Sequence, residues 1–342
     1  MRDIRKVGSI GIKTVVYYLL TTACAIVMGL LMGQLMKGFF PVLSTTDLQY
    51  EAKASASFMD TLVGIFPSNF LAPMVNANML QIIVMALFLG FGIILVGDKA
   101  EGVRVLIEEL NTVFMKIMEL ILKLSPIGVF CLLTPVVAEN GAEIIGSLAM
   151  VLLTAYISYI VHAVIVYSLS VKTLAGLNPI KFFKGMAPAM AMAFSSASSV
   201  GTLPINMNCA EKLGAKKDVV SFVLPLGATI NMDGTAIMQG VATVFIAQVY
   251  GVELTISQLA VVVLTAVLAS IGTAGVPGVG LVMLTMVLNQ VNLPVEGIAL
   301  IIGIDRILDM SRTAVNISGD AICAMIVAKS EEKYNTDQSA AS

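Results

Sequence analysis

The sequence predicts an all-α integral membrane protein, and its composition, its apolar runs and its buried charges all support this prediction. Hydrophobic residues make up 58% of the chain and charged residues only 12%, whereas about 25% of a typical soluble domain is charged. The mean hydropathy is +0.93. Apolar runs of about 20 residues, the length that crosses a bilayer as a helix, recur along the chain. The charged start, Met-Arg-Asp-Ile-Arg-Lys, does not resemble a cleaved signal peptide.

The composition also disfavours several classes of protein. A formal net charge of −2 argues against a nucleic-acid partner. His162 is the single histidine, and the four cysteines show no paired spacing, so a zinc site is not expected. His162 lies in an apolar run and is expected to pack there. No triad, metal-ligand or phosphate-loop spacing occurs, so the sequence predicts neither an enzyme nor an organic cofactor.

The apolar runs give the order of the predicted elements. They cover residues 14–36, 79–96, 105–137 with a break at 126–128, 144–169, 185–211, 219–250, 259–291 and 300–328. Residues 37–75 are more polar and are predicted to form a long loop. Three runs are interrupted at membrane depth, by serines at 195–199, by Asn-Met-Asp-Gly-Thr at 231–235 and by a glycine-rich stretch at 270–278.

Lysines and arginines set the predicted orientation, because short cytoplasmic loops are rich in them. Four basic residues within the first 13 place the N-terminus in the cytoplasm. Lysines flank the run 185–211 on both sides, so this segment is predicted to enter from the cytoplasm and return. Neither flank of 259–291 is basic, so this segment is predicted to enter from outside. Two opposed re-entrant hairpins, each followed by a helix with polar residues in its middle, predict an inverted repeat with a binding site at its interface.

The last apolar run carries the strongest functional signal. Asp305, Asp309, Arg312, Asn316 and Asp320 fall within about 80° of one helix face. A charge at mid-membrane costs at least about 2.5 kcal/mol, so these side chains must face protein or water and mark a path for a solute or ion. The Arg312 fork matches a carboxylate, and Asp309 would accept hydrogen bonds from an ammonium group.

The interruptions supply the other half of the predicted site. Unwound helix ends leave N–H groups that attract carboxylates and carbonyls that attract cations. The break at 231–235 offers Asn, Asp and Thr oxygens, which suit sodium better than a soft metal. Each feature also has a purely structural interpretation: Arg312 pairs with Asp305, the serines pack helices, and the break is a kink.

Three motifs resemble those of the dicarboxylate/amino acid:cation symporters, which include the glutamate and aspartate transporters. They are Leu-Pro-Leu-Gly-Ala-Thr-Ile-Asn-Met-Asp-Gly-Thr at 224–235, Gly-Thr-Ala-Gly-Val-Pro-Gly at 272–278 and Asp-Met-Ser-Arg-Thr-Ala-Val-Asn at 309–316. The resemblance covers nearly the whole chain. It implies a glutamate-transporter-like elevator fold, in which a homotrimeric scaffold stays fixed while a transport domain in each protomer crosses the membrane.

The resemblance divides the chain and places it in the cell inner (plasma) membrane, with both termini in the cytoplasm. The expected parts are the remaining scaffold and early helices at 1–137, the sixth helix and a cytoplasmic linker at 138–184, the core transport domain at 185–330 and a cytoplasmic tail at 331–342. The run 14–36 would correspond to the third helix of the family and would also contribute to an ion site. The first two helices of the family, which help to make the trimer contact, are expected to have no counterpart here.

The resemblance also implies the site residues, carried over position by position. The substrate set is Ser198, Ser199, Thr235, Gly275, Asp309, Arg312, Thr313 and Asn316. Asp309 would meet an amino group and Arg312 a side-chain carboxylate. The three sodium sets are Gly227, Asn231, Asn316 and Asp320; Thr229, Ser270, Ile271 and Thr273; and Tyr18, Thr21, Thr22, Asn231 and Asp233. Relatives carry another arginine where this chain has Ala197 or Met310, and Arg306 is predicted to take its role.

The function expected from these features is sodium-coupled import of L-aspartate or L-glutamate. The partners are the acidic substrate, membrane lipids and two further copies of the chain. The alternative is a C4-dicarboxylate carrier for succinate, fumarate or malate, coupled to protons or sodium. Asp309 favours a substrate with an ammonium group, and Arg312 disfavours a neutral amino acid. An ion channel is the competing class, but opposed hairpins suit alternating access better.

Overall fold

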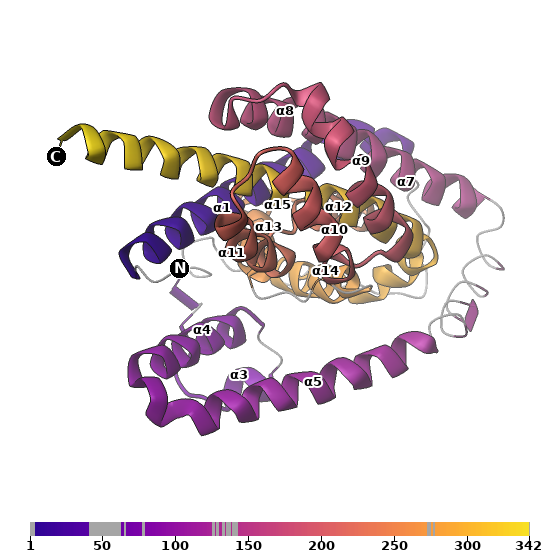
Figure 1. Ribbon diagram of the computed structural model, residues 1–342. Coiled ribbons are helices and arrows are strands. Elements are labelled where there is room, and N and C mark those ends of the chain that lie inside the picture. Colours follow the sequence, from indigo (N-terminus) through magenta and orange to yellow (C-terminus); the bar gives the residue numbers. More distant parts are fainter. Residues whose placement is uncertain are drawn as a thin grey trace.

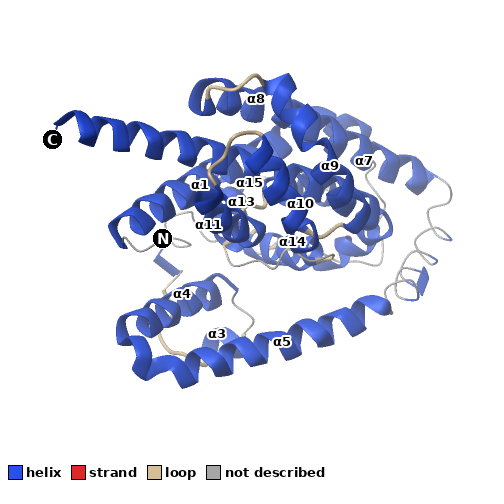
Figure 2. Cartoon of the chain, viewed as in Figure 1, coloured by secondary structure: helices blue, strands red, loops and turns tan. Residues whose placement is uncertain are grey.

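The computed structural model describes residues 4–40, 63–64, 66–76, 79–124, 127, 130–131, 134, 138, 143–271, 275 and 278–341. These residues form helices and connecting loops, with no strand among them (Figure 2). The early helices are α1 (Ile4–Met36), η1 (Lys37–Phe39), α3 (Ala72–Val75), α4 (Met79–Val96), η2 (Gly97–Ala100) and α5 (Glu101–Lys123). The later ones are α7 (Glu143–His162), η3 (Ala163–Tyr167), α8 (Ser168–Ser170), η4 (Val171–Ala175), α9 (Pro179–Ser196), α10 (Ser199–Lys212), α11 (Lys217–Ile230), α12 (Asp233–Val249), α13 (Ile256–Ser270), α14 (Val279–Gln290), η5 (Val295–Gly297) and α15 (Ile298–Ala341).

Three described helical stretches are long and apolar enough to cross a membrane. They are Gly8–Phe39, Gly146–Ala175 and Lys217–Val249, and α13 and α14 are shorter apolar helices. Large apolar side chains such as Leu20, Leu31 and Leu35 are exposed along α1. Outward-facing leucines of this kind suit a lipid environment, as the predicted membrane embedding requires.

The centre of the molecule is a bundle in which α12 packs between α1, α7 and α15 (Figure 1). Every residue of α12 except Gln248 is buried. Its crossing with α1 is close because glycines meet there. A Cβ on Gly240 would lie 2.7 Å from the backbone nitrogen of Leu30, and one on Gly29 would overlap the carbonyl oxygen of Ile237. The crossing therefore fixes the height of α1 against α12.

Two helix pairs, α9 with α10 and α13 with α14, lie around this bundle. In the first, α9 ends at Ser196, Ala197 takes a left-handed conformation (φ 52°), and Ser198 caps α10 by accepting a hydrogen bond from the N–H of Gly201. In the second, α13 ends at Ser270 and α14 begins after Gly278, whose φ is 82°. The interrupted runs at 185–211 and 259–291 are thus helix pairs, as predicted.

The break at 231–235 is also confirmed, because α11 ends at Ile230 and α12 starts at Asp233. Asn231 takes an extended conformation (φ −86°, ψ 101°), which exposes helix-end groups in the protein interior. The first and last α-helices are longer than predicted, and α5 begins earlier, at Glu101. Short helices at Lys37–Phe39 and Ala72–Val75 correct the prediction of one continuous loop at 37–75, whose residues 41–62 lie outside the described part.

Helices α3, α4 and α5 form a separate group at the bottom of Figure 1. Val84 of α4 packs against Leu264 and Leu268 of α13, which joins this group to the bundle. The far end of α15 projects beyond the bundle (Figure 1). Lys13 of α1 and Glu331 of α15 form an ion pair of 2.8 Å, so these helices also meet near the two chain ends.

Candidate functional site

A small cavity lies where the two helix pairs, the break between α11 and α12, and the middle of α15 meet. It is lined by Ala197, Ser199, Met232, Thr235, Gly275, Val279, Asp309, Arg312, Thr313 and Asn316. Seven of the eight residues of the predicted substrate set are among them, all but Ser198. Ala197, Met232 and Val279 line the cavity without having been predicted; they are apolar, so no charge pattern singled them out.

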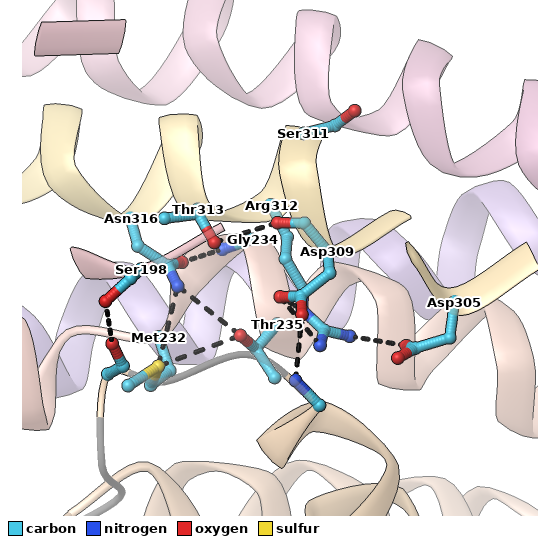
Figure 3. Close-up of polar contacts among 12 residues, drawn as sticks. Ser198, Met232, Gly234, Thr235, Asp305, Asp309, Ser311, Arg312, Thr313 and Asn316 are labelled. Atoms are coloured by element: carbon cyan, nitrogen blue, oxygen red, sulfur yellow. Dashed lines mark hydrogen bonds and ion pairs between the residues drawn. The ribbon is translucent and has the colours of Figure 1, made fainter. Parts of the chain in front are cut away.

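Ser198 joins the two turns. Its hydroxyl donates a hydrogen bond to the carbonyl of Gly275 at 3.1 Å, and the N–H of Val200 donates to the same carbonyl at 3.4 Å. The tips of the two helix pairs therefore touch beside the cavity (Figure 3).

Arg312 is fully buried and shared between two aspartates (Figure 3). Its Nη1 donates to Asp305 Oδ1 at 3.0 Å, and its Nε donates to Asp309 Oδ1 at 2.9 Å. Gly280 of α14 makes room for the guanidinium, because a Cβ there would overlap it. The prediction that Asp305 pairs with Arg312 as a structural unit is thus confirmed in geometry, and Asp309 joins the same unit.

Asp309 also touches the second helix pair. Its Oδ2 accepts a hydrogen bond of 2.8 Å from the N–H of Gly278, at the start of α14. A carboxylate is stabilised at a helix N-terminus, where N–H groups are free. The same carboxylate therefore holds both the arginine and the start of α14.

Asn316 is a residue of α15, and its side chain contacts the start of α12. Its Oδ1 accepts a hydrogen bond of 2.7 Å from the N–H of Gly234, and its Nδ2 lies 3.4 Å from Thr235 Oγ1 and 3.5 Å from the sulfur of Met232 (Figure 3). These bonds anchor α15 on the break between α11 and α12. They also bring the amide, the hydroxyl and the thioether to one wall of the cavity.

The first predicted sodium set consists of Gly227, Asn231, Asn316 and Asp320, and these residues lie together behind this wall. Asn231 Nδ2 donates to the carbonyl of Asn316 at 2.8 Å and to Asp320 Oδ1 at 2.9 Å, and Gly227 is in contact with Asp320. Asn231 Oδ1 and Asp320 Oδ2 are buried and have no hydrogen-bond partner in the described part of the chain. Unpaired buried oxygens are costly, and a small hard cation would satisfy both. These oxygens are of the kind that suits a small hard cation.

Three of the five residues of the third predicted sodium set, Thr21, Thr22 and Asp233, meet at the Asp233 carboxylate. Its Oδ1 accepts hydrogen bonds from Thr22 at 2.8 Å and Thr21 at 3.3 Å, both on α1. The side chain of Asn231 faces Asp320 instead. The hydroxyl of Tyr18 donates to the carbonyl of Val223 at 3.2 Å and is in contact with Gly227, so it lies towards the first set.

Two residues beside Asp233 were not predicted to belong to the site. The hydroxyl of Tyr167 donates to Asp233 Oδ2 at 2.8 Å, and His162 Nε2 lies 3.6 Å from the same oxygen. His162 is fully buried, as expected from its apolar run, but the carboxylate beside it was not foreseen. A π-helical stretch turns these two side chains to one face, which sequence periodicity does not reveal.

The second predicted set stays a prediction. The hydroxyls of Thr229 and Ser270 bond to carbonyls of their own helices, Ile271 follows the end of α13, and Thr273 lies outside the described residues. Arg306 is exposed and does not line the cavity. The role of the missing arginine therefore stays a prediction for Arg306, whose exposed side chain is not part of the cavity wall in this conformation.

Buried charges, broken helices and an apolar exterior together indicate a membrane-embedded protein. The sequence model of the sodium:dicarboxylate symporter family matches residues 1–330. The chain therefore belongs to the sodium:dicarboxylate symporter family.

Individual relatives match almost the whole chain. A proton/sodium-glutamate symport protein of Bacillus caldotenax is 35% identical over 345 aligned positions, which cover 98% of this chain and 82% of the relative. A proton/glutamate-aspartate symporter of Escherichia coli (strain K12) is 33% identical, covering 97% and 79%. A C4-dicarboxylate transport protein of Bacillus subtilis (strain 168) is 31% identical, covering 99% and 82%.

Proposed function

We propose that this chain is a secondary active symporter that imports L-aspartate or L-glutamate together with sodium by an elevator mechanism. The observation that carries the proposal is the pairing of Arg312 with Asp309 inside the cavity. These two side chains are the complements of a carboxylate and an ammonium group. An acidic amino acid carries both groups and can exchange with the internal pair.

The exchange follows from charge. Asp305, Asp309 and Arg312 together carry one net negative charge. A substrate carboxylate that binds Arg312 releases Asp309, and the substrate ammonium then satisfies Asp309. Asp305 continues to hold Arg312 from the other side, at 3.0 Å. The second substrate carboxylate would meet the Ser199 hydroxyl and the Asn316 amide. The exchange leaves neither Arg312 nor Asp309 without a charged partner, a loss that would cost about 3–5 kcal/mol.

The contact between the tips supports a gating role for the second helix pair. Gly278 is bonded to Asp309, and Gly275 is bonded to Ser198. A substrate that takes over Asp309 would compete with the Gly278 contact, so substrate binding and the position of α14 are linked. This supports alternating access with the run 259–291 as an external re-entrant gate.

The arrangement of the helices supports a mobile unit in an elevator. Residues 185–330 would form its core, as proposed from the sequence. The close glycine crossing with α12 and the contact of Thr21 and Thr22 with Asp233 favour adding α1 to this unit. Helices α4 and α5, which lie apart from the bundle in Figure 1, would belong to the scaffold and to the contacts of a homotrimer.

We place the protein in the cell inner membrane with both termini in the cytoplasm. The Lys13–Glu331 ion pair supports this, since it brings the start of α1 beside the late part of α15. Sodium is the proposed coupling ion because Asp233 and Asp320 are buried carboxylates with oxygen neighbours. The named bacterial relatives include proton-coupled proteins, so replacement of sodium is part of the test.

The second candidate is a symporter of C4-dicarboxylates, which the similarity to the Bacillus subtilis C4-dicarboxylate transport protein favours. A dicarboxylate has no ammonium group for Asp309. Aspartate should therefore displace succinate far more effectively than the reverse if the first proposal holds.

The test is uptake of labelled L-aspartate by proteoliposomes that contain the purified chain. An inward sodium gradient should drive accumulation, and replacing external sodium by potassium should abolish it. Unlabelled glutamate should compete and succinate should compete weakly. Accumulation that persists without sodium but follows a proton gradient would contradict the sodium assignment. Stronger competition by succinate than by glutamate would favour the dicarboxylate carrier.

A further inference from the structure

We infer that His162 is a positioning residue for cation binding, which it serves by donating a hydrogen bond from Nε2 to Asp233; this rests on the proposed sodium symport. Its imidazole is fully buried, with Nε2 3.6 Å from Asp233 Oδ2. This gap is slightly longer than a hydrogen bond. A small movement of Asp233 when a cation enters would close it.

The local helix geometry aims His162 at this carboxylate. His162 ends α7, and Ala163–Tyr167 forms a π-helical turn. In a regular α-helix, residues five apart point about 140° away from each other. The wider π turn, with its i→i+5 hydrogen bonds, brings His162 and Tyr167 together, and their ring centroids are 4.7 Å apart. Both side chains then face Asp233 Oδ2.

The two rings differ in how fully their polar atoms are used. The Tyr167 hydroxyl already donates to Asp233 Oδ2 at 2.8 Å. In the described part of the chain, neither His162 nitrogen has a hydrogen-bond partner. An imidazole buried without partners carries a desolvation cost and marks a place where a contact is made in another state.

The proposed contact would orient the carboxylate. Thr21 and Thr22 hold Oδ1 from α1, and Tyr167 holds Oδ2 from η3. A donor on Oδ2 from His162 would be the fourth donor to a carboxylate that has about four acceptor sites, so it would fix the plane of the carboxylate and place its negative charge beside the cation. Partners that orient a metal-binding carboxylate are worth about 10–100-fold in ion affinity.

Three substitutions separate hydrogen bonding from packing. His162→Gln places an amide N–H close to the position of Nε2, whereas His162→Asn places one close to Nδ1. His162→Leu keeps bulk and removes both donors. The full-length chain is purified in detergent, and aspartate binding is measured as sodium chloride replaces choline chloride at constant ionic strength. The readout is the sodium concentration that gives half-maximal aspartate binding.

We expect His162→Leu and His162→Asn to raise this sodium concentration about 10-fold or more, and His162→Gln to stay within about threefold of the wild type. Aspartate affinity at saturating sodium should be unchanged in all three. The melting temperature without sodium reports folding separately, and the Gln and Asn pair suffices if the Leu variant does not fold.

Two results would overturn the inference. If all three variants keep the wild-type sodium dependence, His162 does not position Asp233. If all three raise it equally, the ring acts through packing alone. Failure of the proposed function looks different, because the wild type itself would then bind aspartate without regard to sodium, or would not bind it.

Discussion

Two buried clusters, one on α15 and one shared between α12 and α15, deal with charge in opposite ways. Arg312 is satisfied by Asp305 and Asp309, so this cluster holds its own counter-ions. Asp233 and Asp320 are equally buried, yet no lysine or arginine in the described part of the chain pairs with either. Their neighbours are hydroxyls, amides and His162. The first cluster is suited to exchange partners with a zwitterion, and the second to receive cations.

The difference shows how one helix can couple two solutes. Asn316 stands between the clusters, since its side chain lines the cavity while its carbonyl accepts a hydrogen bond from Asn231. Asn231 in turn bonds to Asp320. A cation that reorients Asn231 would therefore change the hydrogen bonding of Asn316 at the cavity wall. Coupling through this bridge requires no contact between ion and amino acid.

The largest expected effect comes from removing Arg312, which carries the positive charge of the cluster with Asp305 and Asp309. Arg312→Ala removes the positive charge that pairs with the buried carboxylates of Asp305 and Asp309, which costs about 2–5 kcal/mol, or on the order of 30-fold to several thousand-fold in affinity. Aspartate uptake should fall to background, while any transport of neutral amino acids should survive. Uptake in proteoliposomes checks this, with Arg312→Lys as the control for charge without the fork. Retained aspartate affinity in Arg312→Ala would contradict the assigned role.

Loss of a charge at Asp233 or Asp320 should instead change the sodium concentration that aspartate binding requires. Asp233→Asn keeps the size of the side chain but removes the charge that attracts a cation, so half-maximal sodium should rise by about 10–100-fold. Asp320→Asn tests the other carboxylate of the same cluster. Sodium titrations of aspartate binding measure both. An unchanged sodium requirement in both variants would remove the distinction between the clusters.

The glycine crossing of α1 and α12 should affect stability before it affects binding. Gly29→Ala introduces a Cβ that overlaps the Ile237 carbonyl, so the helices must separate at a cost of about 1–3 kcal/mol. We expect a lower melting temperature and weaker sodium binding, because Thr21 and Thr22 move with α1. Gly8→Ala on the same helix meets no atom within 4 Å and is the matched control. Equal melting temperatures for the two variants would show that the crossing is not tight.

The smallest effect is expected at Arg306. Its side chain is exposed and outside the cavity, so Arg306→Ala should leave aspartate affinity within about twofold of the wild type. A binding isotherm at saturating sodium measures this. A large loss would show that the arginine enters the site in a conformation other than the one described here.

The sequence predicted most of the cavity because its residues sit in ordered motifs at helix breaks. Asn231, Asp233, Arg312 and Asn316 could be placed near one another, since each is a polar group at membrane depth that must face a partner. What escaped prediction depends on three-dimensional detail. The π turn after His162 changes the helix period over a few residues, and nothing in the apolar string at 163–167 marks it.

Two further features could not be predicted from the sequence because they also depend on three-dimensional detail. Ser198 was grouped with Ser199, but the left-handed turn at Ala197 directs Ser198 to Gly275 and Ser199 to the cavity. The sharing of Arg312 between two aspartates depends on side-chain rotamers rather than on spacing. Helix periodicity placed all three on one face, yet it could not say which of them would bond.

The most direct test of this account is the dissociation constant of L-aspartate for the purified chain, measured by calorimetry in sodium and in potassium at equal ionic strength. The account predicts tight binding in sodium and a loss of at least about 10-fold in potassium, because Asp233 and Asp320 lack their cations there. Equal dissociation constants in the two salts would contradict it.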